Sequence, residues 1–560
     1  MVWLKEIIRH QKLTDWICEN PGKTCIFIIL LWTFVGQTGH DPWKPDEAHT
    51  FGVTLGILKK GEWIVPLLAN EPYLKHSILV YLSSALTAIL TKSFFPLHDG
   101  ARLSTGIWMI VVFLFTAFSA KELWGGKSTW LAPLILAGSV GLLVRGHQLT
   151  PNIIFLAGVA ISIYGMAVAP RRPIVGGIGI GFGVAISSIS TGLVDPWMII
   201  LFIFGMMLIS PLYRTKHFLI SIAIAFLIAL PLISIWPFFL YTTDPVLFFE
   251  WFNIYNLERM RDIFIISSKD RFFYYVGILP WFSWPAWPFA IWALWIARGQ
   301  GFQRREIQLP VVTFISILFF LTVSGKGREI LALPLLIPLS LLASISFKNI
   351  PRGATNAFYW FGLMVSIFTV TLCWSCFSAI ELQHPRWLAD VFLKYQPFYK
   401  SNPTAQQILA GALGTIVWLA LLFNLKKFSE RSAIVWTSSI TIGWFLVVVL
   451  LFPWINSIKT YRYMVEDLVQ HIPSDVECVS RVRIREPQRA MLDYFGNLIT
   501  IPIENRFKSE RCNFLLAEGE WNAERYLINK WERIWEGGRF GDEKERYYLY
   551  RKKITKDHNL

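Results

Sequence analysis

The chain has 560 residues, of which 54% are hydrophobic and only 16% are charged, and it contains 26 tryptophans. Its mean hydropathy of +0.46 and its repeated long apolar runs exclude an ordinary soluble protein and indicate a polytopic membrane protein. The formal net charge of +15 does not indicate nucleic acid as a partner, because the basic residues lie mostly in short loops between apolar runs, where they set topology and meet anionic headgroups.

The first apolar run covers residues 24–38 and follows Lys5, Arg9, Lys12 and Lys23. No small-residue cleavage site accompanies the run, which is typical of a retained signal anchor. We therefore expect the N-terminus to lie in the cytoplasm and no segment to be removed.

An Asp-Glu pair, Asp46 and Glu47, comes shortly after this run. Carboxylates near hydrocarbon are costly, and those that are present usually have a function. Two adjacent carboxylates at a membrane surface, followed by His49, Lys75 and His76, therefore indicate a candidate functional site.

Basic loops alternate with less basic ones along the apolar region. The basic loops, which we predict to be cytoplasmic, lie at residues 121–127, 171–172, 214–216, 298–305, 348–352 and 426–431. The less basic segments, which we predict to face outward, lie at residues 145–152, 192–195, 241–272, 324–329 and 381–403. This alternation requires that residues 78–95 do not cross the membrane, so we predict an in-plane interfacial helix there; a plain membrane span is the alternative.

The predicted fold class is mainly α, with about 13 transmembrane helices and with in-plane helices in a first outer loop that spans residues 39–100. The transmembrane domain covers residues 1–455. A soluble α/β domain, predicted to be extracytoplasmic, covers residues 456–560, where the composition becomes charged and mixed. Its candidate strands are residues 477–484, 498–503, 512–517 and 547–551, and its candidate helix is residues 486–495.

The cysteine positions agree with the division into a transmembrane domain and an outer soluble domain. Cys478 and Cys512 lie on candidate strands of the outer domain, where an oxidising space allows a disulfide, although spacing alone leaves the pairing open. Cys373 and Cys376 have the CxxC spacing, but inside an apolar run this spacing favours helix packing over a metal or redox site.

The first outer loop carries an ordered set of motifs: Asp46-Glu47, Gly61-Glu62-Trp63, Val65-Pro66, Asn70, Pro72-Tyr73 and Lys75. This set resembles the signature of the polyprenyl-phosphate-sugar dependent glycosyltransferases of the C superfamily, which includes the aminoarabinose transferase of lipid A and the protein O-mannosyltransferases. Residues 101–103, 270–281 and 327–339 look similar in the same order. The resemblance fades after about residue 350.

The resemblance implies an inverting membrane glycosyltransferase of the cytoplasmic membrane. Such an enzyme takes a sugar from a polyprenyl-phosphate donor, which is undecaprenyl phosphate in bacteria, and transfers it to a lipid, glycan or protein on the outer face. Lipid A modification and protein glycosylation are the cell-envelope activities that the resemblance suggests. The implied partners are the donor, the acceptor and the bilayer, and no nucleic acid.

The chemistry of sugar transfer assigns roles to these residues. An acceptor hydroxyl or amine loses a proton as it attacks the anomeric carbon, and Asp46, paired with Glu47, can accept that proton as a general base, a contribution of about 10²–10⁴-fold. The departing phosphate needs positive charge, for which the candidates are Lys75, Arg102, Lys326 and Arg328. The alternatives are structural: Asp46 as a helix N-cap with Glu47 in the first turn, and the basic residues as interfacial anchors.

Two further sets of residues carry weaker signals. His49 and His76 can join Asp46 at a divalent metal, although a hydrogen-bonding role for the histidines is the alternative, and no cofactor is certain. Tyr274, Tyr275 and Trp281 belong to an aromatic segment that reads first as an interfacial belt, and they can also line a groove for an isoprenoid tail or a sugar ring.

The loops depart from the pattern of the resembled family at several positions. Leu74 stands where many relatives of the aminoarabinose transferase have Glu, and His76 and Ser77 replace two prolines. Asn152 and Thr191 stand where Asp and Lys-Gly are common, and Asn cannot accept a proton at neutral pH. Glu71 or His76 is a candidate to compensate for Leu74.

Two other function classes remain open from the residues alone. One is a non-catalytic polyprenyl-phosphate binder or assembly subunit, which predicts that Asp46 can be replaced without consequence. The other is a lipid or solute transporter, which the few ionisable residues in the spans and the lack of an inverted repeat disfavour. The sequence leaves the sugar, the acceptor, the polyprenol length and the oligomeric state open.

Overall fold

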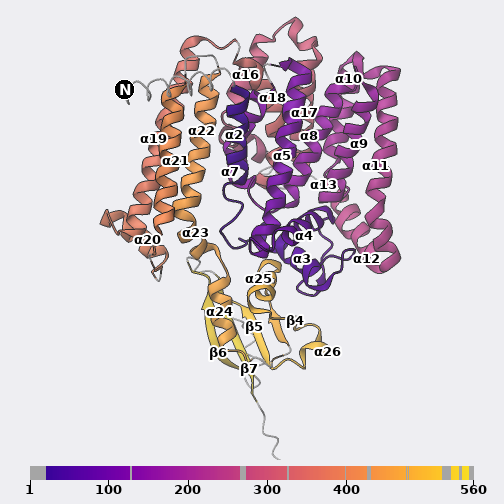
Figure 1. Ribbon diagram of the computed structural model, residues 1–560. Helices are drawn as coiled ribbons and strands as arrows, with labels where there is room; N and C mark the ends of the chain where they lie inside the picture. Colours follow the sequence, from indigo (N-terminus) through magenta and orange to yellow (C-terminus); the bar gives the residue numbers. More distant parts are fainter. Residues whose placement is uncertain are drawn as a thin grey trace, which may run out of the picture.

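The computed structural model describes residues 21–126, 129–264, 273–324, 327–347, 349–397, 399–400, 402–425, 430–473, 476, 478–519, 531–540 and 545–553. Long helices form a bundle, and a small sheet lies beyond one end of it (Figure 1).

Nine helical segments among these residues are long and apolar enough to cross a membrane, by length and composition. They are α5 (Leu97–Trp124), α8 (Pro151–Val168), α9 (Pro173–Thr191), α11 (Lys216–Thr243), α17 (Arg305–Val323), η5 (Glu329–Leu335) with α18 (Leu336–Ser346), α19 (Arg352–Glu381), α21 (Ala405–Asn424), and α22 (Arg431–Leu446) with η6 (Val447–Leu451) and α23 (Phe452–Lys459). The mainly α membrane fold agrees with the prediction, and the total of about 13 crossings stays a prediction.

Shorter apolar helices accompany these segments. They are α2 (Pro21–Phe34), α4 (Leu79–Thr91), α10 (Trp197–Ile209) and α16 (Ala286–Ile296). The helix predicted in plane is α4, whose 13 residues fall short of the roughly 20 that a crossing needs. One face, with Tyr81 and Ala85, is buried, whereas Leu90 is 69% exposed. This length and one-sided burial fit an interfacial helix.

The remaining helices are short. They are α3 (Asp46–Lys60), α6 (Leu131–Ala137), α7 (Val140–Arg145), η2 (Pro211–Arg214), α12 (Pro245–Glu250), η3 (Trp251–Glu258), α13 (Arg259–Phe264), α15 (Tyr274–Phe282), η4 (Gln300–Gln303) and α20 (Arg386–Tyr395). In Figure 1, α3 and α4 lie between the bundle and the sheet.

Ion pairs join several of the loops predicted to be cytoplasmic. Arg171 and Arg172 both pair with Glu122, and a guanidinium nitrogen of Arg305 lies 3.9 Å from the same carboxylate. Three basic loops that are distant in the sequence therefore share one end of the bundle, as the charge alternation predicted.

The loops predicted to face outward are joined in the same manner. Arg145 pairs with Glu329 at 3.2 Å, and Arg259 pairs with Asp195 at 2.6 Å. The segments at residues 145–152, 192–195 and 324–329 therefore lie beside other predicted outward segments. Part of the predicted loop 241–272, residues 265–272, lies outside the described residues.

The C-terminal part begins with α24 (Arg462–Gln470) and forms a five-stranded mixed sheet of order β4-β3-β5-β7-β6. Its elements are β3 (Val479–Val482), α25 (Glu486–Gly496), β4 (Thr500–Pro502), α26 (Arg506–Ser509), β5 (Phe514–Glu518), β6 (Trp531–Gly538) and β7 (Arg546–Lys552). β3 pairs in parallel with β4 and β5, whereas β7 pairs antiparallel with β5 and β6. The four predicted strands and the predicted helix coincide with these elements. β6 was missed because it is an edge strand that carries exposed Glu532, Arg533 and Glu536 and so lacks an apolar run.

Cys478 and Cys512 form a disulfide, which agrees with the pairing that the sequence allowed. The bridge joins positions 34 residues apart. Replacing both cysteines by alanine is expected to destabilise the sheet by about 3–4 kcal/mol, because the loop in the unfolded chain is no longer closed. The midpoint of thermal unfolding of the C-terminal part, monitored by proteolysis, measures this change. Cys373→Ala in α19 is the control. An unchanged midpoint in the double variant would contradict it.

The first outer loop packs tightly on the C-terminal part. A Cβ added at Gly52 of α3 would lie 2.3 Å from the Cβ of Ala490 in α25, so only glycine allows this approach. Glu71, in the hairpin of β1 (Leu67–Leu68) and β2 (Glu71–Pro72), accepts hydrogen bonds from Arg481 and pairs with Arg489 at 2.7 Å. One buried hydrophobic cluster includes Phe51 together with residues of α25 and the sheet.

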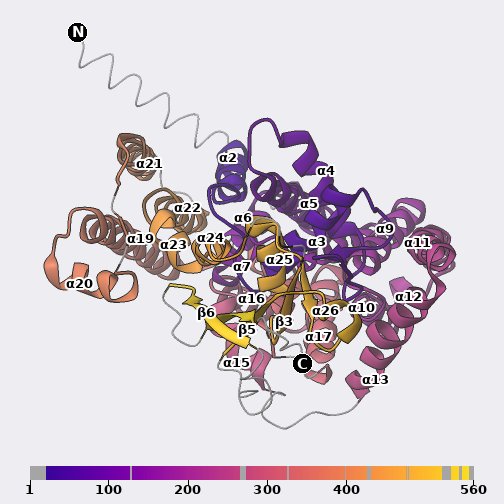
Figure 2. The same ribbon diagram turned by 90° about the horizontal axis from the view of Figure 1, so that it is seen from below.

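Figure 2 views the molecule from this end and shows α25 and α3 close together near the middle of the bundle. The first loop and the C-terminal part therefore form a continuous packed layer over the bundle end. The boundary at residue 455 stays a prediction, because the two sides share this core.

Candidate functional site

Asp46 is the first residue of α3 and follows Pro45. Its side chain caps no backbone amide of the helix, so the alternative of an N-cap role is not what the structure shows. Instead, one terminal guanidinium nitrogen of Arg328 donates to both carboxylate oxygens, at 2.6 and 2.8 Å. The side chain of Asp46 is 17% exposed, so the carboxylate is accessible.

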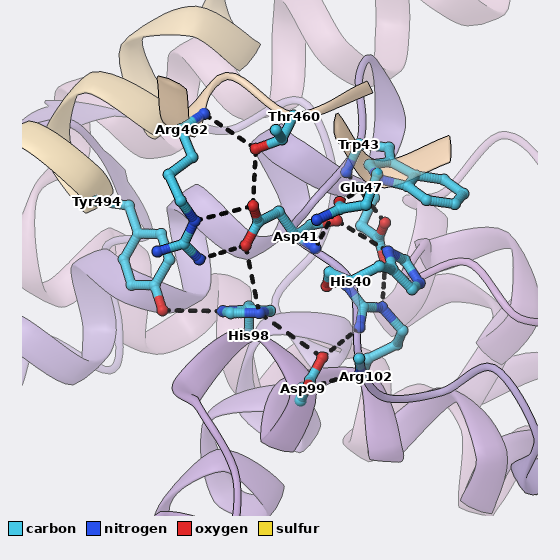
Figure 3. A network of polar contacts seen from close by, with 12 residues as sticks. His40, Asp41, Trp43, Glu47, His98, Asp99, Arg102, Thr460, Arg462 and Tyr494 are labelled. Atoms are coloured by element: carbon cyan, nitrogen blue, oxygen red, sulfur yellow. Dashed lines mark hydrogen bonds and ion pairs between the residues drawn. The ribbon is translucent and has the colours of Figure 1, made fainter. Parts of the chain in front are cut away.

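Glu47 lies in a buried network with Trp43 and Arg102 (Figure 3). It accepts a hydrogen bond from Nε of Arg102 and a second from the backbone amide of Trp43 at 3.2 Å. Its side chain is 3% exposed. A catalytic role of Glu47 stays a prediction, and its contacts in this structure join the start of α3 to Trp43 and Arg102.

Arg102 is enclosed in the same network. It donates to Glu47, to Asp99 at 2.7 Å, and to the backbone carbonyls of Gln37 and His40. Its side chain is 1% exposed. A role of Arg102 in binding the donor phosphate stays a prediction, and in this structure its guanidinium is buried and holds these four partners.

A neighbouring part of the network ties the first loop to the C-terminal part. Arg462 and Thr460 donate to the carboxylate of Asp41, and the phenol of Tyr494 lies 2.9 Å from Nδ1 of His98 (Figure 3). Nε2 of His98 lies 3.7 Å from Asp41. These contacts link the loop, the start of α5, α24 and α25 into one rigid support for α3.

A polar cavity of about 540 Å³ opens between α3, the residues before α4, the turn before η5, and the start of α25. Its lining residues are Pro45, Asp46, His49, Lys75, His76, Arg328, Ile484, Arg485, Glu486, Pro487 and Arg489. Four basic side chains and two carboxylates line the cavity, and Arg489 and Arg485 also pair with Glu71 and Glu518 outside its lining.

Two of the four predicted phosphate-binding residues reach this cavity. Lys75 is half-exposed and lies 3.7 Å from Glu486, and Arg328 pairs with Asp46. Lys326 lies outside the described residues. Sequence reasoning thus brought Asp46, Lys75 and Arg328 to one site, although it did not predict their partners.

The C-terminal part supplies cavity residues that sequence reasoning missed, namely Arg485, Glu486 and Arg489. Charged residues on a small soluble domain do not by themselves indicate a site. The signal in the sequence is weak: a Glu-Pro pair at the start of a predicted helix, with arginines on both sides. Only the docking of α25 on α3 brings these side chains beside Asp46.

His49 and His76 line the cavity with ring centroids 6.5 Å apart. Burial lowers the pKa of His49 and holds the pKa of His76 well below its usual range, so both rings are neutral at pH 7. In the described part of the chain, no three His, Cys, Asp or Glu side chains gather to hold a metal ion. A metal site of Asp46, His49 and His76 stays a prediction, and the carboxylate of Asp46 pairs with Arg328 in this structure.

The three aromatic residues proposed for a groove differ in their exposure and in their neighbours. The side chain of Tyr275 is buried, whereas Trp281 is 47% exposed. Tyr274 packs against Gly327, one residue before Arg328. None of the three lines the polar cavity. A role in a lipid groove stays a prediction.

The structure also shows the surroundings of residues that depart from the family pattern. Leu74 is buried in the hydrophobic cluster of the first loop, so that position supplies no carboxylate. Glu71 does not replace it, because its carboxylate is held by Arg481 and Arg489 outside the cavity lining. The backbone carbonyl of Thr191 accepts a hydrogen bond from Arg259.

Comparison with known proteins gives a consistent family resemblance. The chain is 21% identical over 440 residues to the undecaprenyl phosphate-alpha-4-amino-4-deoxy-L-arabinose arabinosyl transferase of Pseudomonas paraeruginosa, an alignment that covers 75% of this chain and 73% of that protein. It is 23% identical over 336 residues to the transferase of the same name from Serratia proteamaculans, covering 57% of each. No family model matches the chain.

A solved structure matches the whole arrangement. The crystal structure of ArnT from Cupriavidus metallidurans bound to undecaprenyl phosphate superposes with a TM-score of 0.68 at 13% identity, covering 96% of this chain and 98% of that one. The two chains therefore share a fold that includes the C-terminal part. The resemblance predicted from the first outer loop is confirmed.

Proposed function

We propose that this protein is a membrane glycosyltransferase that takes a sugar from a polyprenyl-phosphate donor and transfers it to an acceptor at the outer membrane surface. The observation that carries the proposal is the cavity that brings Asp46, Lys75 and Arg328 together at one end of an apolar bundle. The printed names of the sequence relatives support undecaprenyl phosphate as the carrier and an aminoarabinose as the sugar.

The reaction assigns one task to each side chain. The acceptor hydroxyl oxygen attacks the anomeric carbon, the bond from that carbon to the phosphate oxygen breaks, and its electron pair stays on the phosphate. The acceptor proton passes to the carboxylate of Asp46, which acts as general base. Lys75 and Arg328 stabilise the charge that the leaving phosphate gains. Attack opposite the leaving group inverts the anomeric configuration.

The orientation in the membrane belongs to the same proposal. The N-terminus lies in the cytoplasm, and the C-terminal part, residues 456–560, lies outside the cytoplasmic membrane. The gathering of Arg171, Arg172 and Arg305 at the opposite end from the cavity supports this, because basic loops stay on the cytoplasmic side. A lipid acceptor is the class that reaches a cavity at a membrane surface most directly.

Loss of sugar from a radiolabelled undecaprenyl-phosphate donor, measured with the full chain in lipid nanodiscs, tests the proposal. Lys75→Ala is expected to lower transfer by about 10²-fold, because one positive charge at the leaving phosphate is lost. Lys92→Ala is the matched control, since Lys92 is an exposed lysine outside the cavity lining.

Two results would overturn the proposal. One is absence of transfer by the wild type across a panel of sugar donors. The other is equal transfer by Lys75→Ala and the wild type at equal protein levels. After the first result a non-catalytic polyprenyl-phosphate binder would be the better account, whereas the second would leave a transferase in which Lys75 does not bind the leaving phosphate.

A further inference from the structure

The cavity contains two ion pairs, and each joins a carboxylate to a cation proposed for the donor phosphate. Arg328 holds both oxygens of Asp46, at 2.6 and 2.8 Å. Lys75 lies 3.7 Å from Glu486 of the C-terminal part. The side chains of Arg328 and Lys75 are each 53% exposed, so both pairs are open to solvent and to a ligand.

The pairing with Arg328 conflicts with the proposed role of Asp46 as base. A carboxylate whose two oxygens both accept from a guanidinium is poorly placed to take a proton from an acceptor. The guanidinium of Arg328 is also held by Asp46 at the step in which the leaving phosphate needs its positive charge. The proposed chemistry therefore requires Asp46 and Arg328 to change partners.

We infer that Asp46 and Glu486 hold the places of the donor phosphate before the donor binds, and that donor binding transfers Arg328 and Lys75 from these carboxylates to the phosphate. The inference rests on the proposed function and adds an order of events to it. Donor binding uncovers the base, so the donor must bind before the acceptor can react.

The energetics favour this exchange. Half-exposed ion pairs contribute little to stability, because water competes for both partners. The donor phosphate is a diester with one negative charge, as a carboxylate has, but its oxygens accept hydrogen bonds from both cations at once, so one ligand replaces two separate weak pairs. Glu486 belongs to α25, which means that the C-terminal part takes part in donor binding.

Binding of undecaprenyl phosphate to the full chain in nanodiscs tests the exchange. Asp46→Asn removes a competitor for Arg328 and is expected to tighten binding by about 5-fold, although it abolishes the base. Glu486→Gln is expected to tighten binding in the same direction. Glu329→Gln is the control, because Glu329 pairs with Arg145 outside the cavity lining and its neutralisation should leave binding unchanged.

A double variant distinguishes the release of Arg328 from Asp46 from a simple loss of repulsion between the Asp46 carboxylate and the lipid phosphate. Arg328→Gln alone is expected to weaken binding about tenfold, and adding Asp46→Asn to it should give no tightening, because no guanidinium remains to be released. Tightening that persists in the Arg328→Gln background would overturn the inference. Equal tightening for undecaprenol, which has no phosphate, would overturn it as well.

The inference and the proposed function fail in different measurements. If the wild type transfers sugar but neither Asp46→Asn nor Glu486→Gln tightens binding, the exchange is wrong and the transferase assignment stands. If both variants tighten binding but the wild type transfers no sugar from any donor, the exchange stands at a phosphate-lipid site and the transferase assignment is wrong.

Discussion

Replacing Asp46 by asparagine is expected to lower sugar transfer by at least about 10²-fold, because the acceptor proton loses its destination. Asparagine has nearly the same shape and can still accept a hydrogen bond from Arg328, so the fold should be unaffected. The measurement is single-turnover transfer from the radiolabelled donor in nanodiscs. Single turnover separates the chemical step from product release.

The control for this prediction is Asp244→Asn. Asp244 precedes α12 and caps its first backbone amides, so it is an acidic residue at a helix start outside the cavity lining. Its replacement should leave transfer unchanged. Equal transfer by the wild type and Asp46→Asn would exclude Asp46 as the base.

Measuring sugar transfer together with undecaprenyl phosphate binding tests the prediction more strictly. An Asp46→Asn variant that transfers poorly and also binds undecaprenyl phosphate more tightly has lost the base without losing the donor site. A variant that has simply misfolded would lose both properties.

Replacing Arg102 by methionine is expected to reduce the free energy of unfolding by about 3–5 kcal/mol, the largest stability effect that the structure predicts. The change leaves the carboxylates of Glu47 and Asp99 buried without their shared cation, and it leaves the carbonyls of Gln37 and His40 without a donor. Unfolding in mixed dodecyl sulfate and maltoside micelles measures the change.

Arg171→Met is the matched control, because the side chain of Arg171 is 64% exposed and Glu122 keeps Arg172 as a partner. We expect a change within about 1 kcal/mol for this variant. Comparable unfolding for Arg102→Met and Arg171→Met would show that the network is not needed for stability. A phosphate-binding role for Arg102 would instead predict a stable protein with weakened donor binding.

The two arginines show where sequence reasoning reached its limit at the site. Arg102 and Arg328 both lie in motifs of the resembled family and both were assigned to the phosphate. They differ only in their neighbours: Arg102 meets Glu47 and Asp99 in a buried space, whereas Arg328 stands half-exposed at the cavity. Burial is a property of the packed chain, so no motif distinguishes them.

The sequence by itself determined the features that depend on local pattern and on membrane dimensions. The long apolar runs specify helices because the bilayer leaves the backbone no other way to satisfy its hydrogen bonds, and the basic loops specify which connections share an end. The short run at α4 followed from the same alternation. Alternating apolar residues likewise specified the buried strands of the C-terminal sheet, whereas the polar edge strand β6 escaped notice.

Only the tertiary structure decided the composition of the site. Glu71 meets Arg481 across 410 positions, and the same docking of α25 on α3 brings Glu486 beside Lys75. Such contacts depend on the shapes of two packed surfaces, which no spacing along the chain records. The sequence indicated a candidate base and two cations, and only the fold showed that the carboxylates of Asp46 and Glu486 pair with those cations.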